Sequence, residues 1–333
     1  FALWSIASAL VGWAGSFAEI FALRLLLGIG EATAPLVSVT FIRRNFSEAE
    51  RGLPTGIYLS GLMVGPALSL AAGGYAMEWM GWRNLFLLTG FGALLWLIPW
   101  VILGPSGRTR GQRETAGHEP GVGVAALLRS PLVWSVLSGT FFYAYLWYFI
   151  ITWLPSYLVM ERGFAYGEMG ALTGQAMFGM AILSPLSGRW ADHRIARQGN
   201  ALAVRRGLFF GGMMLASVMM LLPSAGSRPA ILAVLLLSFG GIGIAAPNFW
   251  ALLHTMTPSP FIGRAMGVQN AISSLSGVCA PILTGYMVGE SKNFQQAIVF
   301  AGATPVVAGL IYLTFIKEKH VEEFRRILGE ADA

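Results

Sequence analysis

Residues Glu19 to Ile42 read EIFALRLLLGIGEATAPLVSVTFI, and this stretch decides the fold class. It is long enough to cross a bilayer as one helix, which needs about 20 residues. Between its two ends, Arg24 and Glu31 are the only ionisable residues, and their spacing of two helical turns places both on one face. A charged group inside a membrane helix is costly and is usually kept for a function. The pattern indicates the working face of a transporter helix.

The composition extends this conclusion to the whole chain. Of 333 residues, 55% are hydrophobic and only 11% are charged, whereas soluble domains carry roughly 25% charged residues. A soluble core this apolar would leave too little polar surface to cover it. The single cysteine, Cys279, excludes an internal disulfide framework. We therefore predict an all-α polytopic membrane protein, with the lipid bilayer as its surroundings.

Apolar runs separated by loops predict the membrane spans. No alternating ten-residue pattern of the kind that barrel strands need is present. Ten spans are expected, at about 1–17, 20–42, 53–77, 84–103, 131–158, 168–190, 206–223, 229–252, 265–288 and 295–316. Because the chain begins at Phe1 inside an apolar run, we expect it to be a fragment.

The distribution of Lys and Arg predicts the orientation. Of the 22 such residues, 17 lie in alternate loops and at the C-terminal end, and four lie in the other loops. Basic loops stay in the cytoplasm, so the C-terminus is expected there, in the inner (plasma) membrane of the cell. The net charge of +6 then reflects topology, and we expect no nucleic-acid partner.

An internal repeat predicts the architecture. Residues 56–75 and 267–286 both open with Gly and close with Gly-Tyr, and each follows a basic loop. Two six-helix halves with parallel topology are one transporter plan. The offset of 211 between the two stretches leaves two spans of the second half without a partner in the first. We therefore expect ten of twelve transmembrane helices, divided into a partial N-terminal bundle (1–103), a cytoplasmic linker (104–130), a C-terminal six-helix bundle (131–318) and a cytoplasmic tail (319–333).

Several motifs carry a resemblance to a known family. They are Arg24 to Ala32 followed by Pro35, Glu48 to Gly52, Gly81 to Arg83, Thr152 to Tyr157, and Ser187 to Asp192. Together they resemble the anion:cation symporter family of the major facilitator superfamily, which includes bacterial sugar-acid/proton symporters. The resemblance covers essentially the whole chain, as family helices three to twelve, and implies an N-terminal truncation.

The resemblance implies a secondary active transporter that takes up an organic anion, such as a sugar acid or another carboxylate, with a proton, by alternating access. It implies a monomer without cofactor. A uniporter or exporter of the same fold is the alternative. An enzyme is not expected, because no cluster of His, Asp or Cys is evident and no two histidines have metal-ligand spacing. Leu62 stands where some sugar-acid carriers have glutamine, which leaves room for a less hydroxylated acid.

The resemblance assigns proton coupling to Glu31. A carboxyl group in hydrocarbon favours its neutral form, so Glu31 would load a proton outside and release it inside. The alternative is a neutral carboxyl that bonds a neighbouring helix. Arg24, nearer the external end, either attracts anions and closes the outer gate or extends to the headgroups. The family's anion-binding arginine is expected on a helix before Phe1.

Polar and aromatic residues inside the spans are the candidates for substrate binding. They are Asn270, Asn248, Trp250, Tyr143, Trp147, Tyr58 and Gln175. Asn270 fits a family position that bonds substrate hydroxyls, and Trp250 can stack on a sugar face. Tyr143 and Trp147 are four apart on one helical face. The alternative for the amides is bonding between helices, and for the aromatics packing.

Three charged residues at cytoplasmic helix ends are candidates for a gate. Arg51, Arg189 and Asp192 are expected to form ion pairs that hold one conformer, as in other carriers of the superfamily. The alternative is that their charges serve topology alone.

Cysteine labelling tests the predicted orientation. In a background with Cys279 replaced, an impermeant thiol reagent added to intact cells should label Ser224→Cys, in a predicted external loop, and not Ser106→Cys, in a predicted cytoplasmic loop. Equal labelling of both would contradict the topology.

Overall fold

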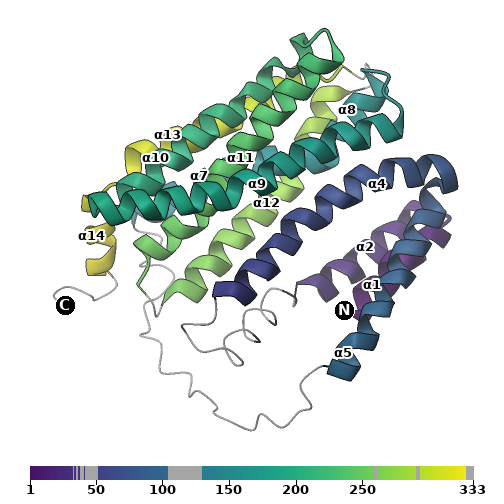
Figure 1. The fold of residues 1–333 in the computed structure, drawn as a ribbon, viewed down its shortest axis with the longest axis horizontal. Helices are drawn as coiled ribbons and strands as arrows, with labels where there is room; N and C mark the ends of the chain where they lie inside the picture. Colours follow the sequence, from purple (N-terminus) through teal and green to yellow (C-terminus); the bar gives the residue numbers. More distant parts are fainter. Residues whose placement is uncertain are drawn as a thin grey trace. The chain divides into compact units, whose positions relative to one another are not determined.

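The computed structural model describes residues 1–32, 34, 37, 41, 52–103, 130–258, 261–289 and 293–327. Within these ranges every regular element is a helix and none is a strand (Figure 1), which confirms the predicted all-α class. The elements are α1 (Ala2–Leu10), η1 (Val11–Trp13), α2 (Phe17–Glu31), α4 (Gly52–Ala93), η2 (Leu94–Trp96), α5 (Leu97–Leu103), α7 (Pro131–Thr152), α8 (Leu154–Met160), α9 (Tyr166–Gln198), α10 (Ala201–Ala216), η3 (Ser217–Ser224), α11 (Arg228–Met256), α12 (Ile262–Val288), α13 (Gln295–Phe315) and α14 (Glu318–Ile327).

Seven of the described helical segments are long and apolar enough to cross a membrane, and the shorter apolar helix Ala2–Trp13 adds to them. One of the seven, Val64–Ile102, combines two expected spans. Within it α4 turns at Gly81, whose backbone angles are φ 75° and ψ 161°. Glycine adopts a positive φ readily because it has no Cβ. The sequence predicted a break between 77 and 84, and Gly81 provides it as a sharp kink within one element. The count of ten of twelve helices stays a prediction, because part of the 20–42 span lies outside the described residues.

The chain divides into two compact units, and each is described by itself. The first comprises Phe1–Thr115 with Tyr166–Ala171. There α1 packs against α2 and α4. The close distance between α1 and α4 requires glycine at position 90, because a Cβ there would lie 2.4 Å from the Ala9 nitrogen. Helix α2 begins at the cap Ser16, whose hydroxyl accepts from the Glu19 N–H. This cap fixes the start of the helix that carries Arg24 and Glu31.

The second unit comprises Ala116–Ala165 with Leu172–Ala333. Helix α7 packs against α12 and α13, and α10 packs against α11 and α13. Glycine brings α10 and α11 together, because a Cβ on Gly241 would lie 2.4 Å from the Ala216 nitrogen and 2.5 Å from the Gly212 oxygen. Such close approach of small residues is how membrane helices gain packing.

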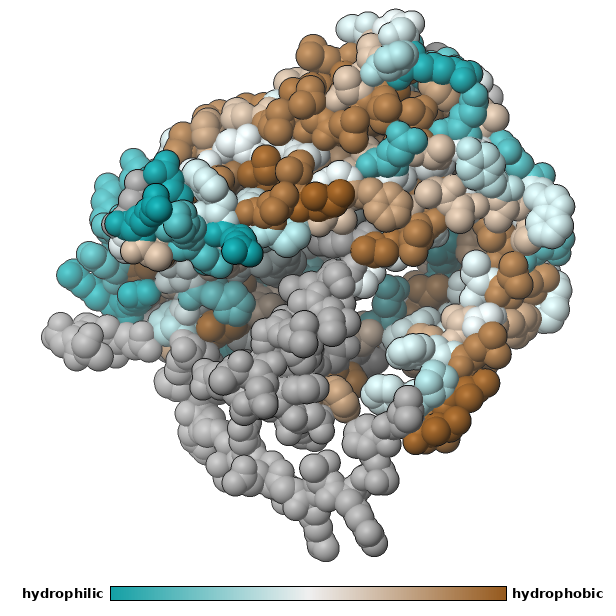
Figure 2. All heavy atoms as spheres, in the orientation of Figure 1, coloured by the Kyte–Doolittle hydropathy of each residue, from teal (hydrophilic) through white to brown (hydrophobic). Residues whose placement is uncertain are grey.

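The surface of this second unit has the polarity that a bilayer requires. In Figure 2 hydrophobic residues cover the sides of its helices, and hydrophilic residues gather at the end that carries α14. Large apolar side chains such as Ile182, Ile282 and Leu310 are exposed along the helices. An apolar band with polar ends is what the predicted membrane protein should present.

The α10–α11 contact predicts the effect of adding one methyl group. Gly241→Ala should lower the stability of the purified protein by about 1–3 kcal/mol, because the new Cβ meets backbone atoms that cannot move aside. Gly211→Ala in α10 is the matched control, since its Cβ meets nothing within 4 Å, and alanine favours helix by up to about 1 kcal/mol. Thermal unfolding in detergent measures both. Equal stability of the two variants would contradict the packing described.

Candidate functional site

The carboxylate of Glu31 is exposed at the last residue of α2. It has no hydrogen-bond or ion-pair partner among the residues the structure describes. The alternative in which Glu31 bonds a neighbouring helix therefore has no support within those ranges. An unpaired carboxylate on a membrane helix is the kind of group that exchanges a proton or meets a cation.

Arg24 lies on the same helix, and its guanidinium carbon is 5.5 Å from the centre of the Phe86 ring on α4. This is cation–π geometry, and it holds the side chain against α4 within the first unit. No ion pair joins Arg24 to Glu31 in the described coordinates, as their spacing predicts. The two charges remain separately available on one helix.

In the second unit a polar seam joins α7 to α12. The Gln269 side chain, 2% exposed, donates from Nε2 to Thr140 Oγ1 at 3.3 Å. Ser276 Oγ donates to the Phe141 carbonyl at 2.9 Å, and the Tyr145 and Thr284 hydroxyl oxygens lie 3.5 Å apart. These bonds hold the two helices in register, although the buried Oε1 of Gln269 has no hydrogen-bond partner among the described residues.

Asn270, the next residue along α12, has the opposite environment. Its side chain is exposed, and it has no hydrogen-bond partner among the described residues. Adjacent helical residues point about 100° apart, so Gln269 faces α7 and Asn270 faces away from it. An exposed amide without a protein partner on a membrane helix is available to a ligand.

Asn248, a predicted substrate-binding residue, has its amide nitrogen bonded inside the second unit, while its buried Oδ1 has no hydrogen-bond partner among the described residues. It is 0% exposed, and Nδ2 donates to Ser187 Oγ at 3.0 Å and to the Ile244 carbonyl at 2.9 Å. Ser187 Oγ in turn donates to the same carbonyl at 2.9 Å. Asn248 therefore joins α11 to α9, which is the interhelical alternative considered from the sequence.

Of the predicted aromatic residues, Tyr143 and Trp147 are half-buried and Trp250 is exposed. Tyr143 stacks on Phe249 with ring centres 4.4 Å apart and lies 6.0 Å from Phe209, so it packs among α10 and α11. Trp250 is 40% exposed and meets Phe249 edge-on at 5.3 Å. Trp147 is half-buried on α7. Of these residues, Trp250 presents the most surface to a ligand.

The remaining predicted residues lie as follows. Gln175 is exposed on α9, and Arg189 is exposed near its end. Asp192 pairs with Arg205 at 2.9 Å, which joins α9 to α10. Arg51 and the side chains of Tyr58 and Leu62 lie outside what the structure describes.

Sequence reasoning missed Gln269 and Arg205 as polar partners. The sequence does not distinguish Gln269 from Asn270, because periodicity cannot decide which of two adjacent amides faces a neighbouring helix. Arg205 was counted only as a topological charge. Within the described ranges, no three His, Cys, Asp or Glu side chains come together in a way that would hold a metal ion.

The chain is similar in sequence to known membrane transporters. Residues 1–281 match the family described as the Major Facilitator Superfamily. The chain is 27% identical to the D-galactonate transporter of Escherichia coli O6:H1, over 94% of this chain and 77% of that protein. It is 27% identical to a probable sulfoacetate transporter of Cupriavidus necator, over 93% and 75%. It is 24% identical to the hexuronate transporter of Bacillus subtilis, over 95% and 77%.

A solved structure shares the fold. It is a bacterial homolog of the human lysosomal transporter Spinster in an inward-facing, unoccupied conformation. The TM-score is 0.72 at 18% identity, over 98% of this chain and 82% of that one.

The contrast between the two asparagines predicts that the same substitution destabilises the protein at one position and not at the other. Asn248→Ala should lower the unfolding free energy by roughly 0.6–2 kcal/mol. The substitution removes one hydrogen bond to Ser187 on α9 and one to the Ile244 carbonyl of the same helix. Asn270→Ala should leave the unfolding free energy unchanged, since the amide has no protein partner in the described coordinates. Thermal unfolding of the two variants side by side measures this. A larger loss for Asn270→Ala would contradict the placement.

Proposed function

The chain belongs to the major facilitator superfamily, and on this premise we propose that it carries a small organic acid into the cell together with a proton. The matched relatives are transporters, so the predicted class, a membrane transporter and not an enzyme, is confirmed. Galactonate, hexuronate and sulfoacetate are all small organic anions. We assign the same substrate class to this chain, with the protein acting as a monomer and its C-terminus in the cytoplasm.

Glu31 is the observation that supports proton coupling. Its carboxylate is exposed on a helix of a membrane transporter and lacks a partner among the described residues. A negative charge is costly in hydrocarbon, so the group crosses between states of the carrier as the neutral acid. Moving an anion together with one proton also keeps the transported charge near zero. A carboxylate fixed in an ion pair would not serve this purpose.

Substrate recognition is assigned to side chains that are free to meet a ligand. In the second unit these are Asn270, Gln175, Trp250 and Trp147, which are exposed or half-buried. Amides bond hydroxyl or carboxylate oxygens, and an indole face covers the apolar side of an organic acid. Tyr58 stays a candidate from the first unit. We assign Asn248 and Tyr143 to support of these residues, because both are engaged within the bundle.

The gate is assigned to charged residues at the two predicted membrane faces. Arg24 serves the external side, and Arg51, Arg189 and Asp192 serve the cytoplasmic side. The Asp192 side chain is 70% exposed in its pair with Arg205, and an exposed pair contributes about 0.2–1 kcal/mol. Asp192 can therefore change partners at little cost when the carrier changes state.

A variant at Glu31 separates coupling from binding. A thermal-shift screen of sugar acids and aromatic acids with the purified full chain first identifies a substrate. The protein is then placed in proteoliposomes for transport measurements. A pH difference of one unit then drives roughly tenfold accumulation per proton in the unmodified protein. Glu31→Gln should abolish this accumulation and retain exchange of labelled for unlabelled substrate, because exchange requires no net proton movement.

Glu19→Gln, at the other end of the same helix, is the matched control and should accumulate substrate normally. Uphill accumulation by Glu31→Gln would remove the proton role. If the unmodified protein exchanges substrate and never accumulates it against a pH gradient, the uniporter alternative holds. Asn270→Ala adds a test of recognition, with an expected rise in KM of about tenfold for the loss of one hydrogen bond.

A further inference from the structure

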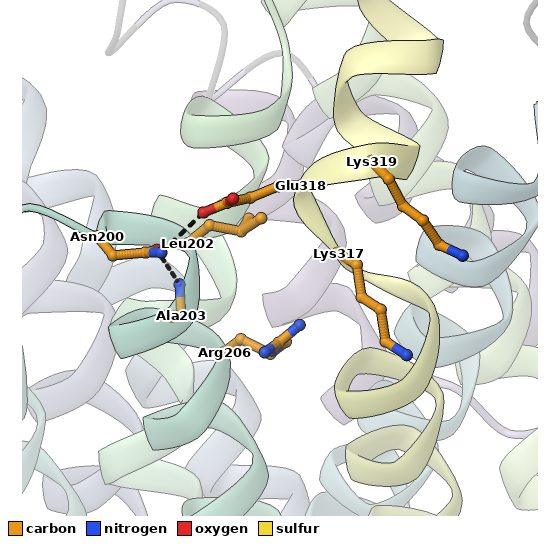
Figure 3. A pocket seen from close by; sticks show the side chains of 7 residues that line it. All are labelled: Asn200, Leu202, Ala203, Arg206, Lys317, Glu318 and Lys319. Carbon is orange, nitrogen blue, oxygen red and sulfur yellow. Dashed lines mark hydrogen bonds between the residues drawn. The ribbon is translucent and has the colours of Figure 1, made fainter.

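We propose that a hollow at one end of the second unit binds the phosphate of an anionic membrane lipid. This corner pocket lies where α10 begins and α13 turns into α14, and its volume is about 390 Å³. Asn200, Ala203, Arg206, Lys317, Glu318 and Lys319 line it (Figure 3). None of these residues has a part in the transport site assigned above.

The charges in the corner pocket favour an anion. Three cationic side chains face one carboxylate, and that carboxylate is already engaged: Asn200 Nδ2 donates to Glu318 Oε1 at 2.7 Å. Figure 3 shows Glu318 directed toward Asn200 and away from the lysines. Neither Lys317 nor Lys319 has an ion-pair partner within the described ranges. Because the Asn200 amide is neutral, Glu318 keeps its negative charge, and three cations against one carboxylate leave the pocket net positive.

Arg206 supplies oriented donors at the centre of this pocket. Its Nη1 donates to the Ile316 carbonyl at 2.7 Å, which fixes the guanidinium between α10 and the α13–α14 corner. Its Nε is buried and has no acceptor among the described residues. A guanidinium matches the geometry of phosphate oxygens. Arg206 therefore adds a cationic group, fixed in position by its bond to Ile316, to the two lysines of the pocket.

The corner pocket also lies at the right depth for a lipid headgroup. Helix α13 is one of the apolar spans and ends at Phe315. Helix α14 follows at once as an amphipathic helix that buries Val321 and Phe324. The change from an apolar span to an amphipathic helix marks the membrane surface. By the distribution of Lys and Arg this is the cytoplasmic face, where anionic lipids and basic pockets meet.

An apolar path leads from the corner pocket along the helices and distinguishes a lipid from a free phosphate. On α10, Ala203, Gly207 and Gly211 are exposed at spacings of four, and a Cβ on either glycine meets nothing within 4 Å. Lys317 lies in the turn between α13 and α14, and on α13 the side chain of Leu310 is 46% exposed. A shallow apolar track beside a basic pocket accommodates an acyl chain. A free anion has no acyl chain that could occupy this track.

Lipid binding to the purified full chain in detergent tests this proposal. Thermal shift or native mass spectrometry is recorded with phosphatidylglycerol, phosphatidylcholine, glycerol 3-phosphate and inorganic phosphate. We expect stabilisation by phosphatidylglycerol only. An equal effect of glycerol 3-phosphate or inorganic phosphate would overturn the lipid source. Equal stabilisation by phosphatidylcholine would overturn recognition of the anion.

Charge-removing variants locate the binding. Lys317→Gln/Lys319→Gln should weaken phosphatidylglycerol binding by about tenfold or more, since each cation near the surface contributes roughly a fivefold factor. Arg206→Gln should weaken it similarly, and the lysine variant keeps the test valid if loss of the bond to Ile316 impairs folding. Arg194→Gln is the matched control, because that arginine lies over Trp190 on α9 and should bind within about twofold of the unmodified protein. Unchanged affinity of the lysine variant would overturn the site.

Discussion

Hydrocarbon offers no hydrogen-bond partner to a polar group, and the rest of the structure depends on this constraint. It forces the described backbone into helices. It also sorts the polar side chains into two sets. Gln269 and Asn248 face neighbouring helices and bond to Thr140 and Ser187. Glu31 and Asn270 face outward and have no partner in the described coordinates. A polar group of the second set is costly unless it meets a proton or a ligand, which is why Glu31 in the first unit and Asn270 in the second are each proposed for transport.

The same constraint explains the ends of the helices. Where α9, α10, α13 and α14 reach the predicted cytoplasmic surface, charged groups appear and are paired loosely or left unpaired. Asp192 meets Arg205 in an exposed pair, which suits a gate that changes partners. Arg206 and the two lysines outnumber the single carboxylate of the corner pocket, Glu318, and form no ion pair with it in the described coordinates, which suits a site for a lipid phosphate.

Much of this was predictable from the sequence, because hydropathy depends on composition along the chain. The spans, the helical class and the transporter family followed from runs such as Glu19 to Ile42 and from the motifs around Glu31. Which face a residue occupies was harder to predict. Asn248 and Tyr143 looked like Asn270 and Trp250 in the sequence, yet the first pair packs inside the bundle. The break that Gly81 makes was predicted between two apolar runs, whereas the corner pocket is formed by helices distant in sequence, which no local pattern reports.

The central claim is that substrate and proton move together. Proton movement during substrate entry tests it most directly. The full chain is sealed into vesicles that contain a pH-sensitive dye, with no initial gradient and with empty vesicles as the control. The account predicts that adding an organic acid substrate outside acidifies the interior only when the protein is present, at a rate that follows substrate entry. Entry of labelled substrate without any change of internal pH would contradict it.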